Sequence, residues 1–120
     1  MNFTWVTFHV SDMEKSLNFY RDLLGMRIVR EFGNENQKLV FLAGDNETQI
    51  ELICQKGESI ENAGKGMSVG FGVTNLDEKI ANLKNQISAP IAGPMSPNPH
   101  MKFYMVPDPD GYTIQLHETI

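Results

Sequence analysis

The chain has 120 residues, a formal net charge of -5 and a single cysteine, Cys54. A chain of this length forms one domain and buries roughly two thirds of the surface exposed by its unfolded form, so its core needs no disulfides. The acidic balance, with no Lys/Arg cluster, argues against a nucleic-acid partner, and no apolar run approaches the ~20 residues of a membrane span. With a lone thiol and no secretory leader pattern, we expect a cytoplasmic protein.

The first half of the chain predicts a strand, a helix and three more strands. Residues 3–10 are rich in aromatic and β-branched residues, which favours a strand. A helix follows, because Ser11 can cap it while Glu14 reaches back in a capping box. Its apolar residues recur at helical spacing, at Leu17, Tyr20 and Leu24, and Gly25 ends it. Strands are predicted over 26–32, 38–43 and 48–54, separated by turn-forming residues at 33–34 and 44–46.

The second half repeats this order less regularly. A strand over 67–74 leads to a helix that Thr74 or Asn75 caps and that ends near Gln86. Its apolar stripe is Leu76, Ile80, Leu83 and Ile87. Four prolines lie within 89–99, so we expect a short irregular strand and a mobile loop there. The last strands are predicted over 101–106 and 112–118, joined by a turn at residues 108–111.

Two sequence matches at nearly the same offset indicate an internal duplication. Residues 10–15 (VSDMEK) recur in kind at 73–79 (VTNLDEK), and residues 50–52 (IEL) recur at 114–116 (IQL). The sequence therefore predicts an α+β fold with two βαβββ modules, at 1–56 and 67–120, joined by a polar connector at 57–66 within a single domain. One helix covers one face of four strands, so we expect curved mixed sheets with helices on their outer faces and an open trough between the modules.

Strand alternation predicts which side chains line that trough. In the first module they are Trp5, Thr7 and His9 of the first strand and Gln49, Glu51 and Ile53 of the fourth. In the second module they are Ser68, Gly70 and Gly72 of the fifth strand and Thr113, Gln115 and His117 of the last.

The order of elements and two motifs resemble the vicinal-oxygen-chelate superfamily, which includes glyoxalase I, extradiol dioxygenases, fosfomycin-resistance enzymes and bleomycin-binding proteins. The motifs are VSDMEKSLNFYRDLLGM at 10–26 and DPDGYTIQL at 108–116. Together with the duplication, the resemblance covers essentially the whole chain. It implies a small-molecule ligand or substrate and a homodimer.

In superfamily members that use a metal, four side chains converge on it, one from the first and one from the last strand of each module. The resemblance places these positions at Trp5, Glu51, Ser68 and Gln115, where the usual pattern has two histidines and two glutamates. Trp5 cannot act as a ligand because its only heteroatom is a hydrogen-bond donor, and Ser68 is a poor ligand at neutral pH. Since a catalytic divalent ion needs about three good donors, we expect no bound metal cofactor.

The remaining polar candidates allow more than one interpretation. Glu51 lies either on the solvated face of an alternating strand or in an apolar trough, where it would be a candidate general base or hydrogen-bond acceptor. His9 and His117 are either half-buried residues satisfied by a neighbour or ligand-binding groups, and a metal set displaced onto them is geometrically costly. His100, among prolines, is expected in an exposed loop.

Two functions from different classes follow. The first is a metal-independent binding protein of the bleomycin-resistance type, which holds a small molecule in the apolar trough; its ligand-binding residues are Trp5, Thr7, His9, Glu51, Ser68, Gln115 and His117. The second is a glyoxalase-like metal-dependent lyase, isomerase or dioxygenase in which Glu51 is catalytic and moves a proton. A module that keeps only the fold is a third possibility.

Overall fold

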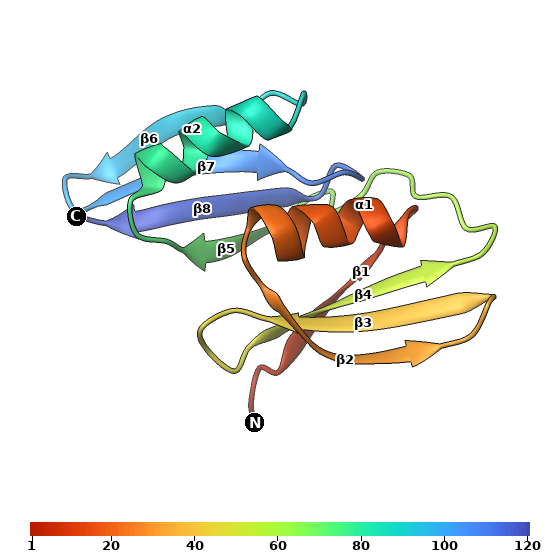
Figure 1. The fold of residues 1–120 in the computed structure, drawn as a ribbon. Coiled ribbons are helices and arrows are strands. Elements are labelled where there is room, and N and C mark those ends of the chain that lie inside the picture. The colour runs from red at the N-terminus through yellow and green to blue at the C-terminus, as the bar shows by residue number, and fades with distance from the viewer. The chain divides into compact units, whose positions relative to one another are not determined.

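The structure, a computed structural model, describes residues 1–120 and divides into two compact units. The first unit is Met1–Glu61 and the second unit is Asn62–Ile120. Each contains one four-stranded sheet and one helical segment (Figure 1). The predicted α+β class with two βαβββ repeats is confirmed.

The first unit forms a mixed sheet with the strand order β1-β4-β3-β2. Its strands are β1 (Trp5–His9), β2 (Arg27–Gly33), β3 (Gln37–Ala43) and β4 (Gln49–Gln55). β1 and β4 are parallel, whereas β4, β3 and β2 pair antiparallel through short connections. The four predicted strands are thus confirmed to within two residues at either end.

The helical segment of this unit begins one residue later than predicted and changes its winding. α1 (Met13–Leu17) is capped by Asp12, whose carboxylate accepts a hydrogen bond from the Lys15 backbone N–H at 3.1 Å, so the predicted Ser11 capping box is wrong. Asp12 can take this role because its short acidic side chain reaches the third helical N–H. The chain then continues as a π-helix, η1 (Asn18–Leu23), and Gly25 ends it with φ +83°.

The π-helical turn determines which aromatic side chains enter the core. Its wider winding buries the adjacent residues Phe19 and Tyr20 together, with their rings edge to face at 4.9 Å. Tyr20 also contacts Phe8 of β1, at 6.0 Å between ring centroids. In Figure 1 α1 lies over one face of the sheet, and it contacts β4. The core of the first unit lies between that face and the helix.

The second unit repeats the topology, with the strand order β5-β8-β7-β6 and a parallel β5–β8 pair. Its elements are β5 (Ser68–Gly72), α2 (Leu76–Gln86), β6 (Ala92–Asn98), β7 (Met101–Pro107) and β8 (Thr113–Thr119). Three of the four residues of the predicted apolar stripe, Leu76, Ile80 and Leu83, are buried, whereas Ile87 is the C-cap residue and only half-buried. Neither α2 nor α1 has the length and apolar character of a membrane-crossing helix.

The proline-rich segment forms more regular structure than predicted. Instead of a short strand and a loop, it forms β6, a seven-residue strand at the edge of the sheet. An edge strand pairs on one side only, so prolines that lack an N–H are tolerated there. The pairing with β7 shifts register on both sides of Met95, which accommodates these prolines.

The helix α2 is capped from a distant strand. Asn75, one of the two predicted caps, is the N-cap residue with φ +54°, but its side chain makes no capping hydrogen bond, so the capping contact predicted for Asn75 or Thr74 is wrong. Instead, the Glu118 carboxylate of β8 accepts hydrogen bonds from the backbone N–H groups of Asn75 and Leu76, at 2.9 and 3.1 Å. A carboxylate at a helix N-terminus also complements the helix dipole.

Asp77, in the first turn of α2, forms a contact whose strength depends on pH. Asp77 accepts hydrogen bonds from the Lys102 ammonium at 2.8 Å and from the Tyr104 hydroxyl at 3.1 Å. The hydrogen bond from Lys102, followed by that from Tyr104, lowers the pKa of Asp77 below its ordinary value of 3.8. Burial raises the pKa of Tyr104, so this hydroxyl remains a donor across the neutral range.

We expect Asp77→Asn to lower stability at neutral pH and to lose this effect in acid. A carboxyl whose folded-state pKa is depressed stabilises the fold above its unfolded-state pKa, and this contribution disappears as pH falls through the folded-state pKa. Urea midpoints of the wild type and Asp77→Asn should therefore converge below about pH 4. Asp45→Asn, in an exposed turn, is the control and should show no such convergence. A constant gap between wild type and Asp77→Asn at all pH values would contradict the assignment.

Candidate functional site

The face of the first sheet that α1 does not cover carries the predicted site residues of the first unit. Trp5, Thr7 and His9 of β1 lie on it, and the parallel register pairs them with Gln49, Glu51 and Ile53 of β4. Phe8 and Val10 point to the opposite face and are buried. The predicted alternation in β1 is therefore confirmed, and we call this surface, on the side of the sheet away from α1, the open face.

Glu51 lies at the centre of the open face and is only 8% exposed. Its carboxylate accepts a hydrogen bond from the Thr7 hydroxyl at 2.6 Å. The interpretation of Glu51 as a solvated strand residue is wrong, because β1 and β3 flank it on both sides and Phe41 of β3 is its direct neighbour. A buried carboxylate held by a hydroxyl donor is a positioned acceptor for a ligand group or a proton.

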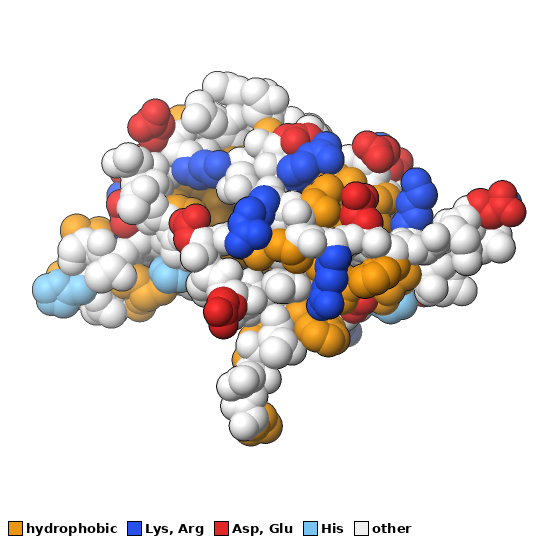
Figure 2. Space-filling model, turned by 60° about the horizontal axis from the view of Figure 1, so that its bottom comes forward, with side chains coloured by type: hydrophobic (Ala, Val, Ile, Leu, Met, Phe, Trp, Pro, Cys, Tyr) orange, Lys and Arg blue, Asp and Glu red, His pale blue; other side chains and the backbone are white.

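Beside Glu51 lies an aromatic and cationic cluster composed of Trp5, Arg30, Phe32 and Phe41, which we call the Arg30 cluster. Phe41 is buried at its centre, and its ring is nearly perpendicular to those of Trp5 and Phe32, with centroid distances of 5.4 and 6.3 Å. The Arg30 guanidinium carbon lies 4.1 Å from the centroid of the Phe41 ring and 5.9 Å from that of Trp5. Both distances are within the range of cation–π attraction. Figure 2 shows Lys and Arg side chains directly beside hydrophobic ones on the surface of the protein.

A β-bulge places Arg30 on the open face. The pairing of β2 with β3 joins Ile28 to Leu42 and then Arg30 to Phe41, so Val29 is an extra residue. Without it, the strict alternation of β2 would turn Arg30 to the helix side. Sequence reasoning missed both members of the Arg30–Phe41 pair. Phe41 was detectable, since the short turn at 44–48 pairs it with Glu51, but nothing in the sequence marks the bulge.

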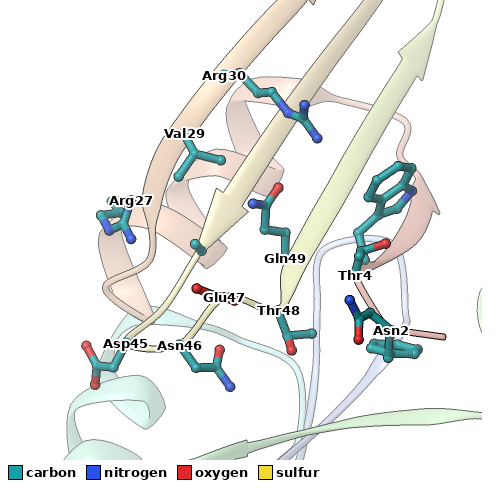
Figure 3. A pocket seen from close by; sticks show the side chains of 13 residues that line it. Asn2, Thr4, Arg27, Val29, Arg30, Asp45, Asn46, Glu47, Thr48 and Gln49 are labelled. Carbon is teal, nitrogen blue, oxygen red and sulfur yellow. The ribbon is translucent and has the colours of Figure 1, made fainter.

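An open pocket of about 780 Å³ adjoins the Arg30 cluster. Its wall includes Trp5, Arg27, Arg30, Thr48 and Gln49, and Figure 3 shows Arg30 and Gln49 extending toward each other across β3. The amide oxygen of Gln49 is buried without a hydrogen-bond partner. The pocket lies beside the Thr7–Glu51 pair rather than around it, because neither of these residues lines it. Its volume is within the range of ordinary small-molecule sites.

The other predicted residues lie in different surroundings. His9 shares the open face, but its Nδ1 contacts the Glu58 carboxylate at 2.9 Å, so it forms an exposed pair. His100 lies in the exposed turn between β6 and β7, as predicted.

The corresponding face of the second unit is lined by glycine and by the three remaining predicted residues. Ser68 pairs with Thr113, Gly70 with Gln115 and Gly72 with His117. The His117 ring lies over these glycines, since a Cβ added to Gly72 would approach its Cε1 to 3.5 Å. Glycine at these positions leaves room for the imidazole. His117 is thus half-buried against its own sheet.

The residues at the family's metal positions do not fit a divalent ion. Trp5 offers no lone pair, and its ring is engaged with Phe41. Glu51 supplies the one carboxylate, and one of its oxygens already accepts the Thr7 hydrogen bond. Ser68 and Gln115 add only a hydroxyl and an amide oxygen, whereas catalytic metal sites use about three His or carboxylate ligands. No group of three His, Cys, Asp or Glu side chains is placed for metal binding within either unit.

Known proteins similar in sequence are mostly named as lyases. The chain is 32% identical over 118 residues to the probable lactoylglutathione lyase of Vibrio cholerae, covering 89% of this chain and 83% of that protein. It is 30% identical over 118 residues to the probable lactoylglutathione lyase of Synechocystis, covering 92% and 89%. Mouse glyoxalase domain-containing protein 4 is 28% identical, and the chain spans 38% of its length.

Solved structures share the fold, and the chain matches a family. Leishmania major glyoxalase I superimposes with a TM-score of 0.79 at 28% identity, covering 97% of this chain and 85% of that one. An antibiotic-binding protein from Streptomyces sp. CB03234 gives 0.78 at 20% identity, covering 100% and 97%, and shows the fold alone. Residues 2–116 match the Glyoxalase/Bleomycin resistance protein/Dioxygenase superfamily, and the chain therefore belongs to that superfamily.

Proposed function

We propose that this protein is a metal-independent small-molecule-binding protein whose ligand stacks on Trp5 at the open face of the first unit. The observation that carries the proposal is Trp5 itself. It occupies the position of the first family ligand, is 45% exposed, and lines the pocket beside the Arg30 cluster. A large rigid aromatic at the wall of a pocket is a typical anchor for an apolar or planar ligand.

The polar groups around Trp5 would orient such a ligand. Thr48 and Gln49 line the pocket, and a rotation of the Gln49 side chain would turn its buried, unpartnered amide oxygen toward the ligand as an acceptor. The Thr7 hydroxyl holds the Glu51 carboxylate through one hydrogen bond and leaves its other acceptor sites available. The trough between the two modules stays a prediction, as do the ligand contacts expected from Ser68, Gln115, His117 and His9.

The sole tryptophan provides a direct test. Its indole N–H gives one cross-peak in a proton–nitrogen correlation spectrum, which we expect to shift when planar probes such as 2-naphthoate, 2-naphthamide and a naphthyl ammonium salt are titrated. Trp5→Ala should weaken binding of the best probe about tenfold, because one aromatic stacking contact contributes about 1–3 kcal/mol. The Trp5 variants have no indole, so their affinities are measured by isothermal titration calorimetry and compared with the wild type by the same method. Trp5→Phe, which keeps an aromatic face, should retain most of the affinity. If no probe moves the indole signal, the proposal fails.

A glyoxalase-like, metal-dependent lyase, isomerase or dioxygenase using Glu51 is the second candidate. It is favoured by the relatives named lactoylglutathione lyase and by the buried, hydroxyl-held carboxylate of Glu51. Metal analysis of protein purified without chelator, together with turnover of a methylglyoxal–thiol adduct, separates the two candidates. Stoichiometric Zn, Ni, Mn or Fe would overturn metal-independent binding. If the purified protein contains no metal and shows no turnover, with or without added ions, the enzyme hypothesis fails.

The homodimer implied by the family resemblance and the cytoplasmic location expected from the sequence stay predictions. Size-exclusion chromatography with light scattering measures the first directly. A mass close to the 13.5 kDa of one chain would contradict it.

A further inference from the structure

We propose that the Arg30 guanidinium is the anion-recognition group of this site, so that the protein takes a planar aromatic acid rather than a neutral or cationic aromatic compound. The inference rests on the proposed function and specifies its ligand class. Three observations on Arg30 support it: the contact of its guanidinium with Phe41, the lack of an ion-pair partner, and the charges that line the pocket.

The way Arg30 is held fixes its orientation without using its hydrogen-bonding capacity. The guanidinium carbon lies over the Phe41 ring, 4.1 Å from its centroid, and this cation–π contact uses none of the N–H donors of the group. All five N–H donors lie in the plane of the guanidinium and remain available at its edge. Stacking on a buried ring thus preorganises a side chain that would otherwise sample many rotamers.

Arg30 also lacks an internal counter-ion. His9, Arg21 and Lys102 each form an ion pair with a carboxylate, whereas no carboxylate lies within ion-pair distance of Arg30. The buried acid in the same cross-strand row, Glu51, is separated from Arg30 by Phe41 of β3 and is held by the Thr7 hydroxyl. A positioned guanidinium with free edge donors is suited to bind a carboxylate through two parallel hydrogen bonds.

The charges that line the pocket leave Arg30 uncompensated. Two arginines and two acids contribute to its wall. In Figure 3 Asp45 and Glu47 lie in the turn that precedes β4, toward Arg27, while Arg30 lies farther along β2. An anion can therefore approach Arg30 without facing these carboxylates directly.

The neighbours of Arg30 determine the remainder of the ligand. Trp5 lies 5.9 Å from the guanidinium, so a ring stacked on Trp5 can carry an acidic group that reaches Arg30. Gln49 lines the same wall, and a rotation of its side chain would present the buried, unpartnered amide oxygen to a ligand hydroxyl or amine. The aromatic surface of Trp5 would bind the ring of the ligand, and the Arg30 cation would bind its acidic group. The site is therefore suited to an aromatic carboxylate.

The test compares 2-naphthoate with its neutral isostere 2-naphthamide, using the Trp5 indole signal and the full chain. We expect the wild type to bind the carboxylate about fivefold to tenfold more tightly, as one charge-assisted contact at an exposed arginine provides. Arg30→Gln should abolish this preference while leaving naphthamide affinity nearly unchanged. Arg30→Lys, which keeps the charge but not the planar fork, should retain only part of it.

Arg21→Gln is the matched control, because it removes the same charge from η1 outside the pocket, and it should keep the full preference. Equal binding of the two probes by the wild type would overturn the anion inference and leave the proposed function standing. A preference that persists in Arg30→Gln would overturn the assignment to this residue. If neither these probes nor the naphthyl ammonium salt moves the indole signal, the proposed function itself fails, and the inference fails with it. A dispersed correlation spectrum of each variant confirms that it is folded.

Discussion

Replacing Phe8 by alanine is expected to lower the free energy of unfolding by about 3–5 kcal/mol, the usual cost of deleting a fully buried aromatic side chain. Phe8 is 1% exposed and packs against Tyr20 on the helix side of β1. The truncation removes apolar contacts and leaves a cavity between β1 and η1 that the neighbouring side chains fill only in part. Urea unfolding monitored by circular dichroism measures the change.

Phe3→Ala is the control for this prediction. It deletes the same side chain just before β1, where Phe3 is 73% exposed, and should change stability by at most about 0.5 kcal/mol. A similar loss in both variants would mean that β1 does not separate a core face from an open face. Since Trp5 and Thr7 alternate with Phe8, the comparison also tests the placement of the site.

Replacing Gly33 by alanine should destabilise the protein by about 2–4 kcal/mol, through backbone strain and overlap with neighbouring atoms. Gly33 ends β2 with φ +127°, and a Cβ there would overlap the backbone carbonyl oxygen of Gln37, which cannot move without opening the β2–β3 hairpin. This hairpin sets the register that places Arg30 over Phe41. The variant should therefore lose stability and weaken naphthoate binding together.

Gly44→Ala is the matched control, because Gly44 follows the last residue of β3 whereas Gly33 lies before its first. Gly44 lies in the turn between β3 and β4, where an added Cβ would meet no atom within 4 Å. Gly44→Ala should be neutral or slightly stabilising, because alanine restricts the unfolded chain more than glycine does. If Gly33→Ala changed the free energy of unfolding as little as Gly44→Ala, the close approach of Gly33 to the Gln37 backbone would be contradicted.

Local sequence signals predicted the elements well where one segment was sufficient to specify them. The alternation of β1, the glycine that ends the first helix and three of the four residues in the stripe of α2 are present as predicted. The predicted capping hydrogen bonds at the start of both helices were wrong. The first helix is capped by Asp12, one residue after the predicted Ser11. The carboxylate at the start of α2 is that of Glu118, which lies 43 residues after Asn75 in the sequence. A contact of that range cannot be recognised from neighbouring residues.

In the proline-rich segment the irregular strand is present as predicted, but it is longer than expected and replaces the predicted loop, for a related reason. Proline lacks an N–H and disfavours a central strand, which is a correct local rule. Its consequence depends on whether the strand pairs on one side or on both. The position of β6 at the edge of its sheet leaves one side of the strand unpaired, and this position is a property of the complete sheet rather than of residues 92–98.

For the site, the sequence by itself determined the superfamily, the duplicated order of elements and the loss of donors at the metal positions. These depend on residue identity and on the two-residue period of a strand, both of which are local. The tertiary structure decided that Glu51 is buried against Thr7, and that Arg30 lies over Phe41 beside Trp5. Burial and stacking depend on strand pairing, and the single extra residue at Val29 determines which face Arg30 occupies, because each shift of one residue turns a side chain to the other side of the sheet.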